Sequence, residues 1–341
     1  MKNYRELEIK VIAEIGVNHN GKLSVAKKLI RESKKCGADF VKFQMYELNE
    51  FTTKYAKKAS YQNKNDGNGD NQYEMLKKLN FSFNQFKVLK KYCNKIKIKF
   101  LVSAFDIPSL RKLKKLNLDY FKIPSGEITN APYLEYLAKL KKKVFLSTGM
   151  STLKDIQYAL DLLIKNGLKK KQITIMQCTS NYPSKISDLN LNVLKTFKDK
   201  FNLKLGFSDH TTSLEAPLFA IFNGATIIEK HITLNKKMKG PDHKASLNVE
   251  EFKKMIDNIN NFQISLGSFK KKPNNEEKKI SLLVRKSVVA KKKIKKGELL
   301  NRINLTCKRP GYGISPKKFG LLINKKANKD YHLDQMIDIK V

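Results

Sequence analysis

The sequence predicts an α/β protein: a (β/α)₈ TIM barrel followed by a small, β-rich C-terminal domain. Three observations support this fold class. Eight short apolar segments rich in β-branched residues recur between residues 8 and 234, and amphipathic segments with helical period lie between them. After about residue 285 the pattern changes to short apolar segments separated by turns. Alternating strand and helix patterns are typical of a parallel sheet covered by helices, and eight such units suffice to close a barrel.

The predicted strands are short and have turn residues or helical patterns at their ends. They are residues 8–16, 39–46, 98–105, 119–126, 143–149, 173–180, 203–209 and 226–234. Helical patterns between them include residues 23–37 and 152–167, each ending at a glycine suited to stop a helix. The long interruption at residues 47–80 contains NKNDGNGDN and is predicted to be a mobile insertion near the barrel mouth.

The domain boundaries follow from a change in composition. We predict a barrel domain over residues 1–267, a linker over 268–284 and a cap domain over 285–341. The segment FKKKPNNEEKK is polar and contains a proline, which is typical of a linker. The last segment is small for independent stability, so it is expected to dock on a barrel, its own or a partner's.

The formal net charge of +38 raises the possibility of a nucleic-acid partner, because lysine and arginine neutralise phosphates. Only six of the 69 basic residues are arginine, however, and the lysines are spread along the whole chain. Arginine is the preferred side chain for forked contacts to phosphates and bases. The composition therefore favours a generally lysine-rich protein over a dedicated nucleic-acid surface, and we expect no nucleic-acid partner.

The remaining composition indicates a cytoplasmic protein without a membrane segment. No apolar run approaches the ~20 residues of a membrane span. The opening sequence MKNYRELEIKVIAEIG lacks the features of a signal peptide. The cysteines form no CxxC pair, so we expect ordinary reduced thiols. They are Cys36, Cys93, Cys178 and Cys307.

Polar residues cluster at the C-terminal ends of the predicted strands, where the active sites of such barrels lie. In strand order they are Glu14, Asn18, His19, Asn20; Lys42, Gln44; Ser103, Asp106; Lys122, Ser125, Glu127; Ser147, Thr148; Thr179, Ser180, Asn181, Tyr182; Ser208, Asp209, His210; and Glu229, His231. All eight strands contribute. The pattern therefore predicts a single polar site at the barrel mouth.

Two lysines of this set predict an anion site. Lys42 and Lys122 lie inside strands, where a lysine cannot easily reach water and burial without an anion is costly. Serine hydroxyls on neighbouring strands can donate to the same anion; they are Ser103, Ser125 and Ser147. We expect these groups to bind a phosphate and a carboxylate.

His210 and His231 lie at equivalent heights on adjacent strands and predict a divalent metal site with open positions for substrate oxygens. The chain has five histidines, and His19 and His243 also lie in predicted mouth segments. Nearby carboxylates favour Mn²⁺ or Mg²⁺ without specifying zinc; they are Asp209, Glu229 and Asp242. Glu14, Glu127 and Glu229 are candidates for general acid or base catalysis, and their individual roles stay open at this point.

Motifs in these same segments resemble one known family. They are AEIGVNHNG (13–21), VKFQ (41–44), FKIPSGE (121–127), STGM (147–150), GFSDHT (206–211), IEKHITL (228–234) and GPDHKASL (240–247). Together they resemble N-acetylneuraminate (sialic acid) synthases and their relatives that make legionaminic and pseudaminic acids. RKSVVA and KRPGYGISP resemble that family's antifreeze-like (SAF) domain, so the resemblance covers essentially the whole chain.

The resemblance implies a transferase that joins carbon 3 of phosphoenolpyruvate to the open-chain aldehyde of N-acetylmannosamine and releases phosphate. It implies that His210 and His231 hold the metal. Phosphoenolpyruvate would be bound by Lys42, Ser103, Lys122, Ser125, Ser147 and Tyr182. The sugar would be bound by Glu14, Gln44, Asp242 and Arg309. The catalytic candidates are Glu14, Lys122, Glu127 and Glu229. Arg309 corresponds to an arginine that the cap of one protomer inserts over the other protomer's barrel, which implies a domain-swapped homodimer.

Two departures leave the sugar open. Some neuraminate synthases have HQTH after the strand-two lysine and an asparagine two residues before the strand-six tyrosine. Here FQMY and Ser180 occupy these places. We expect N-acetylmannosamine as the sugar, with 2,4-diacetamido-2,4,6-trideoxymannose (legionaminic acid synthesis) or a 6-phosphate as alternatives. The alternative from another class is a polyanion-binding protein with an inactive barrel, but such a protein need not retain Lys122, His210 and His231.

Overall fold

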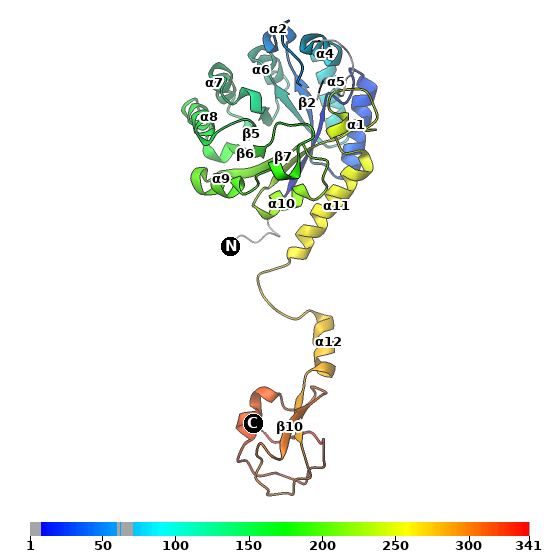
Figure 1. The fold of residues 1–341 in the computed structure, drawn as a ribbon, viewed down its shortest axis with the longest axis vertical. Coiled ribbons are helices and arrows are strands. Elements are labelled where there is room, and N and C mark those ends of the chain that lie inside the picture. The colour runs from blue at the N-terminus through cyan, green and yellow to red at the C-terminus, as the bar shows by residue number, and fades with distance from the viewer. Residues whose placement is uncertain (1–7, 60–61, 63–70, 341) are drawn as a thin grey trace. The chain divides into compact units, whose positions relative to one another are not determined.

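The computed structural model describes residues 8–59, 62 and 71–340. The chain separates after Gly267 into two compact units, which are considered in turn (Figure 1). The segment 63–70, which is most of the predicted mobile insertion's asparagine- and glycine-rich stretch, lies outside the described residues.

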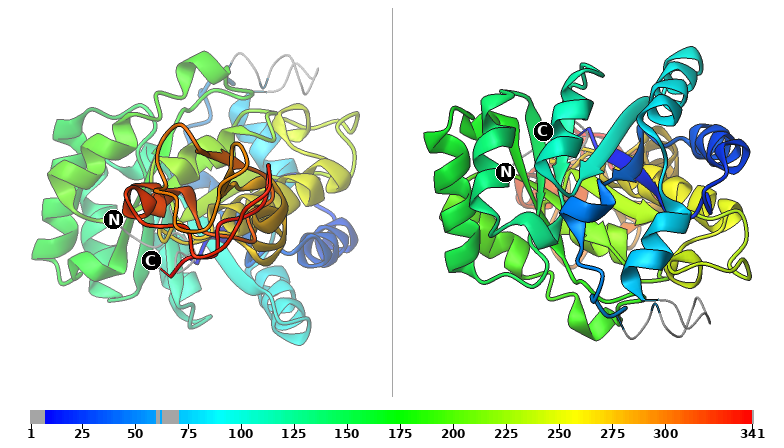
Figure 2. Two further views of the ribbon diagram at one scale, coloured as in Figure 1. Left: turned by 90° about the horizontal axis from the view of Figure 1, so that it is seen from below. Right: turned by 90° about the horizontal axis from the view of Figure 1, so that it is seen from above.

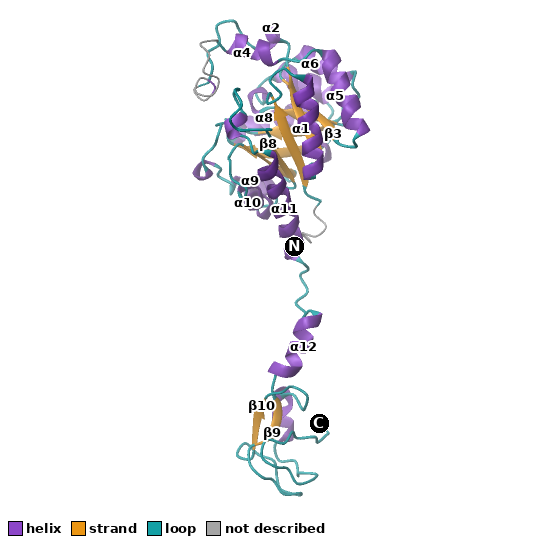
Figure 3. Cartoon of the chain, turned by 90° about the vertical axis from the view of Figure 1, so that its right-hand side faces the viewer, coloured by secondary structure: helices purple, strands orange, loops and turns teal. Residues whose placement is uncertain are grey.

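The first unit is a closed barrel of eight parallel strands in sequence order, as predicted. The strands are β1 (Lys10–Gly16), β2 (Phe40–Met45), β3 (Lys99–Ala104), β4 (Tyr120–Ile123), β5 (Lys143–Ser147), β6 (Ile173–Cys178), β7 (Lys204–Asp209) and β8 (Ile227–His231). Pairing of β1 with β8 closes the ring. Helices surround this ring (Figures 2 and 3).

The helices of this unit surround the strands; most pack apolar faces on the barrel, whereas Leu48–Phe51 and Gln72–Leu79 pack in a separate cluster with Tyr46. They are α1 (Leu23–Cys36), α2 (Leu48–Phe51), α4 (Gln72–Leu79), α5 (Phe83–Lys95), α6 (Ile107–Lys114), α7 (Ala131–Lys139), α8 (Leu153–Lys165), α9 (Val193–Phe201), α10 (Ala216–Phe222) and α11 (Val249–Leu266). Capping boxes begin α5, α8 and α11. Gly37 ends α1 with φ 100°, a left-handed conformation that glycine adopts without steric cost.

Side chains that point into the barrel alternate along each strand and form successive levels. From the N-terminal base to the C-terminal mouth, the strand registers give Lys10, Lys99, Lys143, Lys204; then Phe40, Tyr120, Thr174, Ile227; then Ile12, Leu101, Phe145, Gly206; then Lys42, Lys122, Met176, Glu229; then Glu14, Ser103, Ser147, Ser208. A mostly apolar middle thus separates a basic base from a charged mouth. A Cβ at Gly206 would lie 2.9 Å from Met176 Cγ, so the glycine makes room for that side chain.

The second unit contains a two-stranded antiparallel sheet and a small core. Its elements are α12 (Asn275–Val284), β9 (Ser287–Ala290), β10 (Leu305–Lys308) and α13 (Phe319–Leu322). Its core includes Val288, Leu300 and Tyr331. The prediction of a small β-rich C-terminal domain is confirmed.

Within the predicted linker, residues 268–284, the second half forms a helix, α12. A capping box of Asn274 and Glu277 stabilises the start of this helix. Among the described residues, no helix has both the length and the apolar character needed to cross a bilayer.

Candidate functional site

The barrel mouth holds a buried network of two lysines and two glutamates. Lys122 Nζ donates to both carboxylate oxygens of Glu229, at 2.9 and 3.0 Å. Lys42 Nζ lies 3.5 Å from Glu229 Oε1 and 3.2 Å from Glu14 Oε2. Lys42 is only 5% exposed and Lys122 only 2%. The two lysines are therefore brought together inside the barrel, as the sequence predicted.

The charges of this network are set by burial and by each other. Burial alone would raise the pKa of Glu229, but Lys122 and Lys42 outweigh burial and hold that pKa well below its usual value. Burial, opposed by Lys42, keeps the pKa of Glu14 above its usual value. Glu229 is thus an ionised carboxylate that pairs with the lysines, whereas Glu14 binds a proton more readily than an ordinary glutamate.

Serine hydroxyls line the same part of the lumen. Lys42 Nζ donates to Ser103 Oγ at 3.0 Å, and Ser208 Oγ donates to Glu229 Oε1 at 2.9 Å. Ser147 Oγ is buried without a hydrogen-bond partner among the described residues. A buried hydroxyl without a partner is costly, and an anion in this space would satisfy it.

Ser125, which follows β4, is held at the same place by the loop after β5. The backbone N–H of Gly149 donates to Ser125 Oγ at 3.0 Å. A Cβ at Gly149 would lie 2.1 Å from Ser180 Oγ and 2.8 Å from Ser125 Oγ. Only glycine therefore permits this close approach of the loops after β4, β5 and β6.

Tyr182 and the two predicted metal ligands form a compact group. The ring centroids of His210 and His231 are 5.6 Å apart, and Tyr182 stacks on His210 at 4.0 Å. His210 Nδ1 lies 2.7 Å from the carbonyl oxygen of Thr179, which can only accept. Nδ1 therefore carries the proton in the neutral ring, and Nε2 presents its lone pair to the Tyr182 hydroxyl at 3.1 Å.

His231 has the properties of a potential metal ligand. Burial, assisted by the nearby His210, lowers the pKa of His231 well below its usual value, so the ring is neutral. Its Nδ1 is buried without a hydrogen bond among the described residues, and it lies 4.0 Å from Asp242 Oδ2. Burial raises the pKa of Asp242 to about 7.

These residues could supply only some of the ligands that a metal ion needs. Within the described part of the chain, no three His, Cys, Asp or Glu side chains are arranged to hold an ion. Two imidazoles, one of them with an orphaned ring nitrogen, can hold a metal whose other positions are taken by substrate or water. The geometry is consistent with an open site and not with a closed structural one.

Two sugar-binding candidates lie together at the rim of this network. Gln44 Nε2 donates to Glu14 Oε1 at 3.1 Å, so the amide orients the carboxyl group.

Glu127 lies elsewhere, on the short turn after β4. Its carboxylate accepts a hydrogen bond from Asn130 Nδ2 at 2.6 Å. Burial raises the pKa of Glu127.

The other mouth histidines have structural partners. His19 stacks on Phe81 with ring centroids 3.9 Å apart, and its Nδ1 accepts from the N–H of Gly21. His243 contacts Thr233 Oγ1 at 2.7 Å and Asn20 Oδ1 at 3.2 Å. They fix the loops after β1 and β8 and are not positioned beside His210 and His231.

Asp209 was expected among the carboxylates near the metal, and this expectation is wrong. Its side chain points out of the barrel and pairs with Lys230, with Nζ to Oδ2 at 2.5 Å. Lys230 also donates to Thr211 Oγ1 and to the carbonyl of Ser213, and both charged side chains are fully buried. Strand alternation explains this, because Asp209 and Lys230 have the opposite parity to His210 and His231.

This ion pair leads to a stability prediction. Lys230→Met should lower the free energy of unfolding by about 3–5 kcal/mol, because it leaves Asp209 charged and buried without its partner. The double variant Lys230→Met/Asp209→Asn should recover part of that loss. Urea unfolding monitored by circular dichroism measures both. Lys236→Met is the control: its pair with Glu251 is about one-third exposed, and the expected loss is below about 1 kcal/mol. Equal losses in the two lysine variants would contradict the prediction.

Cys178 is a site residue that the sequence analysis treated as an ordinary thiol. It is buried on β6, and its sulfur lies 3.9 Å from His210 Nδ1. Burial alone would raise the pKa of the Cys178 thiol, but His210 and Lys122 outweigh burial and lower that pKa to about 7. Strand parity could have revealed it, because Cys178 follows the inward-pointing Thr174 and Met176 at intervals of two.

Arg309 belongs to the second unit, within a loop held by Ser287. Ser287 Oγ donates to the Pro310 carbonyl at 2.7 Å and accepts from Gly313 N–H at 2.8 Å. The N–H of Gly311 donates to the carbonyl of Leu282 on α12. The loop is thus fixed to its own unit while Arg309 is exposed.

Comparisons with known proteins agree with this fold. Residues 29–271 match the model of the NeuB family, and residues 285–338 match that of the SAF domain. The N,N'-diacetyllegionaminic acid synthase of Campylobacter jejuni is 47% identical over 96% of this chain and 98% of its own length. The human N-acetylneuraminate-9-phosphate synthase is 35% identical over 96% of this chain and 92% of its own length. The crystal structure of the N-acetylneuraminic acid synthetase of Leptospira borgpetersenii, in complex with citrate, superposes with a TM-score of 0.68 at 30% identity. The superposition covers 80% of this chain and 90% of the Leptospira chain.

Proposed function

The chain belongs to the NeuB family of nonulosonic acid synthases, and from this premise we propose that it condenses phosphoenolpyruvate with an N-acylated mannosamine-type sugar. The observation that carries the proposal is the pair of buried lysines, Lys42 and Lys122, among serine hydroxyls at the barrel mouth. Phosphoenolpyruvate offers both a phosphate and a carboxylate to such a site. The products are a nonulosonic acid and inorganic phosphate.

The reaction forms one carbon–carbon bond and breaks one bond to the phosphate. Carbon 3 of phosphoenolpyruvate attacks the aldehyde carbon, and the aldehyde oxygen takes up a proton and becomes a hydroxyl group. Water adds at carbon 2 and loses one proton to leave a hydroxyl group. The bond between carbon 2 and the phosphate oxygen then breaks, the hydroxyl proton passes to the departing phosphate, and a keto group remains. Lys42 and Lys122 would neutralise the phosphoenolpyruvate anion throughout, assisted by Ser103, Ser125 and Ser147.

The three carboxyl groups would have different roles in the reaction. Glu229 is held ionised between the lysines, so it would orient them and accept hydrogen bonds. Glu14 has a raised pKa and is oriented by Gln44, so it would bind a sugar hydroxyl as donor or acceptor. Glu127 has a raised pKa and would serve as a proton carrier at the edge of the site. Tyr182 would contact phosphoenolpyruvate beside His210.

We further propose that His210 and His231 hold a divalent metal, Mn²⁺ or Mg²⁺, with Asp242 close to His231. When bound, the metal would polarise the sugar aldehyde as a Lewis acid. His231 is neutral and ready to bind, whereas Cys178 outweighs burial and raises the pKa of His210, so His210 would lose any proton on Nε2 when the metal binds.

For the sugar we propose 2,4-diacetamido-2,4,6-trideoxymannose, which makes the product a legionaminic acid. The support is the higher identity to the legionaminic acid synthase of Campylobacter jejuni, 47%, than to the human N-acetylneuraminate-9-phosphate synthase, 35%. Our sequence analysis favoured N-acetylmannosamine, which stays the second candidate because the Leptospira structure is that of an N-acetylneuraminic acid synthetase.

The decisive experiment compares three sugars with the full-length protein, phosphoenolpyruvate and Mn²⁺, with released phosphate as the readout. The sugars are 2,4-diacetamido-2,4,6-trideoxymannose, N-acetylmannosamine and N-acetylmannosamine 6-phosphate. We expect the highest kcat/KM for the first, and mass spectrometry should show a diacetamido keto acid with a nine-carbon backbone. If none of the three sugars led to phosphate release, the synthase proposal would be overturned. A preference for one of the other two sugars would overturn only the choice of substrate.

We also propose a homodimer in which the cap of each protomer covers its partner's barrel, with Arg309 at the N-acyl group of the sugar. Within its own unit α12 leaves Ile280, Leu282 and Leu283 at least half exposed, and an apolar surface of this kind favours a partner.

Arg309→Ala should raise the KM for the sugar by about 10–100-fold, the effect of losing one charge-assisted hydrogen bond. The KM for phosphoenolpyruvate should change less than about twofold, because only the sugar carries the N-acyl group. Steady-state kinetics with each substrate varied in turn measures both. Arg302→Ala, which removes another exposed arginine of the same unit, is the matched control. A parallel rise in both KM values would contradict the assigned contact.

A further inference from the structure

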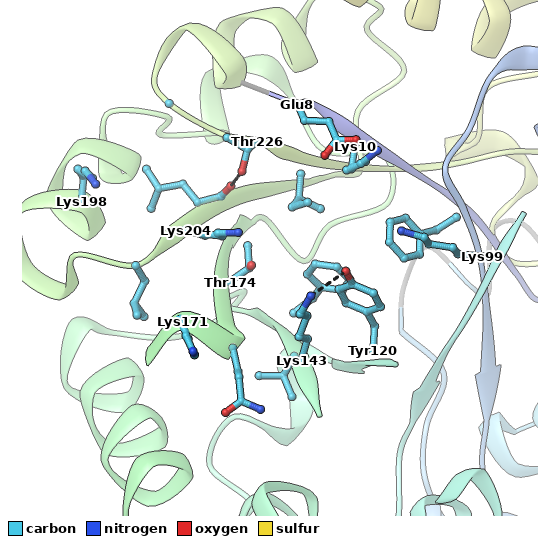
Figure 4. A pocket seen from close by; sticks show the side chains of 18 of the residues that line it. Glu8, Lys10, Lys99, Tyr120, Lys143, Lys171, Thr174, Lys198, Lys204 and Thr226 are labelled. Atoms are coloured by element: carbon cyan, nitrogen blue, oxygen red, sulfur yellow. Dashed lines mark hydrogen bonds and ion pairs between the residues drawn. The ribbon is translucent and has the colours of Figure 1, made fainter. Parts of the chain in front are cut away.

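The end of the barrel opposite the catalytic mouth contains a second cavity, lined mainly by lysines. Its volume is about 540 Å³, which lies within the range of about 300–1,000 Å³ typical of small-molecule sites. The lining contains six lysines and one carboxylate, Glu8. The lysines are Lys10, Lys99, Lys143, Lys171, Lys198 and Lys204 (Figure 4).

Four of these lysines occupy equivalent positions in the fold. Lys10, Lys99, Lys143 and Lys204 are the first residues of β1, β3, β5 and β7. Alternate strands of such a barrel contribute side chains to one common level, so these four lie around the barrel axis. The lysine-rich composition accounts for lysines scattered over the surface, but it does not explain why every odd-numbered strand begins with one.

The positive charge at this base is largely uncompensated. Lys10 pairs with Glu8 and with Asp39, the latter at 3.0 Å. Within the described part of the chain, Lys99, Lys143 and Lys204 form no ion pair. Like charges converging on a concave surface raise the local potential and attract anions.

The inner wall of the cavity is aromatic. Tyr120 is partly exposed and stacks on Phe145 with an interplanar angle of 5°, and Phe40 packs edge-on against both. The Nζ atoms of Lys99 and Lys143 lie 5.7 and 5.2 Å from the centroid of Tyr120. A ligand that reaches these ammonium groups therefore also reaches an aromatic surface.

We propose that the barrel base binds a small molecule bearing an oligophosphate chain. Several ammonium groups around one opening match a chain of linked phosphates better than a single monovalent anion. Tyr120 and Thr174 form the inner end of the site. The site lies on the far side of the apolar middle of the barrel and is independent of the proposed catalytic function.

The test is isothermal titration calorimetry with sodium tripolyphosphate at about 150 mM salt, where long-range attraction is screened. The variant Lys99→Gln/Lys143→Gln/Lys204→Gln should bind at least about tenfold more weakly than the wild type, because three charge-assisted contacts are lost. The control is Lys28→Gln/Lys91→Gln/Lys195→Gln, which removes the same charge from exposed lysines of α1, α5 and α9. It should bind as the wild type does. Undetectable binding by the wild type, or equal weakening in the two triple variants, would overturn the proposal.

A second measurement needs no variant. Acetylation of lysines in the native protein, read by mass spectrometry, should be slowed by tripolyphosphate at Lys99, Lys143 and Lys204. The exposed Lys28 and Lys91 should react unchanged, and uniform protection would overturn the proposal. Replacing tripolyphosphate by a nucleoside triphosphate identifies the source of the phosphates: tighter binding supports a ligand whose base contacts Tyr120, and equal binding supports recognition of the phosphate chain alone.

Discussion

Lys122→Met is expected to lower kcat/KM for condensation by at least about 10²–10³-fold, the usual effect of removing one group that stabilises developing charge. Lys122 is 2% exposed and donates two hydrogen bonds to Glu229, so no water or neighbouring lysine can take its place without rearrangement. Methionine keeps the length and the apolar stem of the side chain but removes the charge. The measurement is phosphate release under steady-state conditions, with phosphoenolpyruvate varied.

The variant also leaves Glu229 buried with less compensation, so stability and catalysis must be separated. Lys122→Met/Glu229→Gln removes the uncompensated carboxylate and should unfold at nearly the wild-type urea concentration while remaining inactive. Lys165→Met, on the exposed side of α8, should change neither property. Recovery of activity in the double variant would show that Lys122 only balances Glu229 and does not bind the substrate.

Removal of the metal should have an effect of similar size. Chelation with EDTA should reduce phosphate release by about 10³-fold, which corresponds to about 4 kcal/mol of lost stabilisation of the transition state, and Mn²⁺ should restore it. The wild-type protein should bind one Mn²⁺ per chain, as measured by electron paramagnetic resonance. His210→Leu and His231→Leu should each abolish that binding, because the described part of the chain contains no group of three His, Cys, Asp or Glu side chains that could hold the ion instead.

His332→Gln is the matched control, because His332 is an exposed histidine of the second unit. It should bind Mn²⁺ and turn over as the wild type does. Full activity of the wild type after exhaustive chelation, with no metal detected by elemental analysis, would contradict the metal proposal. Retained Mn²⁺ binding in His231→Leu would instead move the site away from the predicted pair.

The polar mouth could be predicted from the sequence because strand parity is local information. Along β2 and β4, alternation is enough to place Lys42 and Lys122 on the inner face, and burial of an inward lysine near an anion site follows from desolvation. The same rule, applied more strictly, would have identified Cys178 as inward and Asp209 as outward.

The linker shows the limit of composition as a guide. Residues 268–284 are polar and charged, yet Asn274 and Glu277 provide both halves of a capping box and α12 forms behind them. A local hydrogen-bond signal therefore decided the structure where average polarity suggested none.

The sequence by itself determined the barrel, its eight strands and the inward or outward direction of each side chain, because these depend on periodicities of two and 3.6 residues within one segment. Only the tertiary structure decided the pairings. Lys122 meets Glu229 across 107 positions of sequence, and Lys230 meets Asp209 on the outer face of the barrel. Register and closure relate one strand to another, so they decide which inward groups share a level. The same closure brings four strand-initial lysines around one cavity at the base, which no single segment reveals.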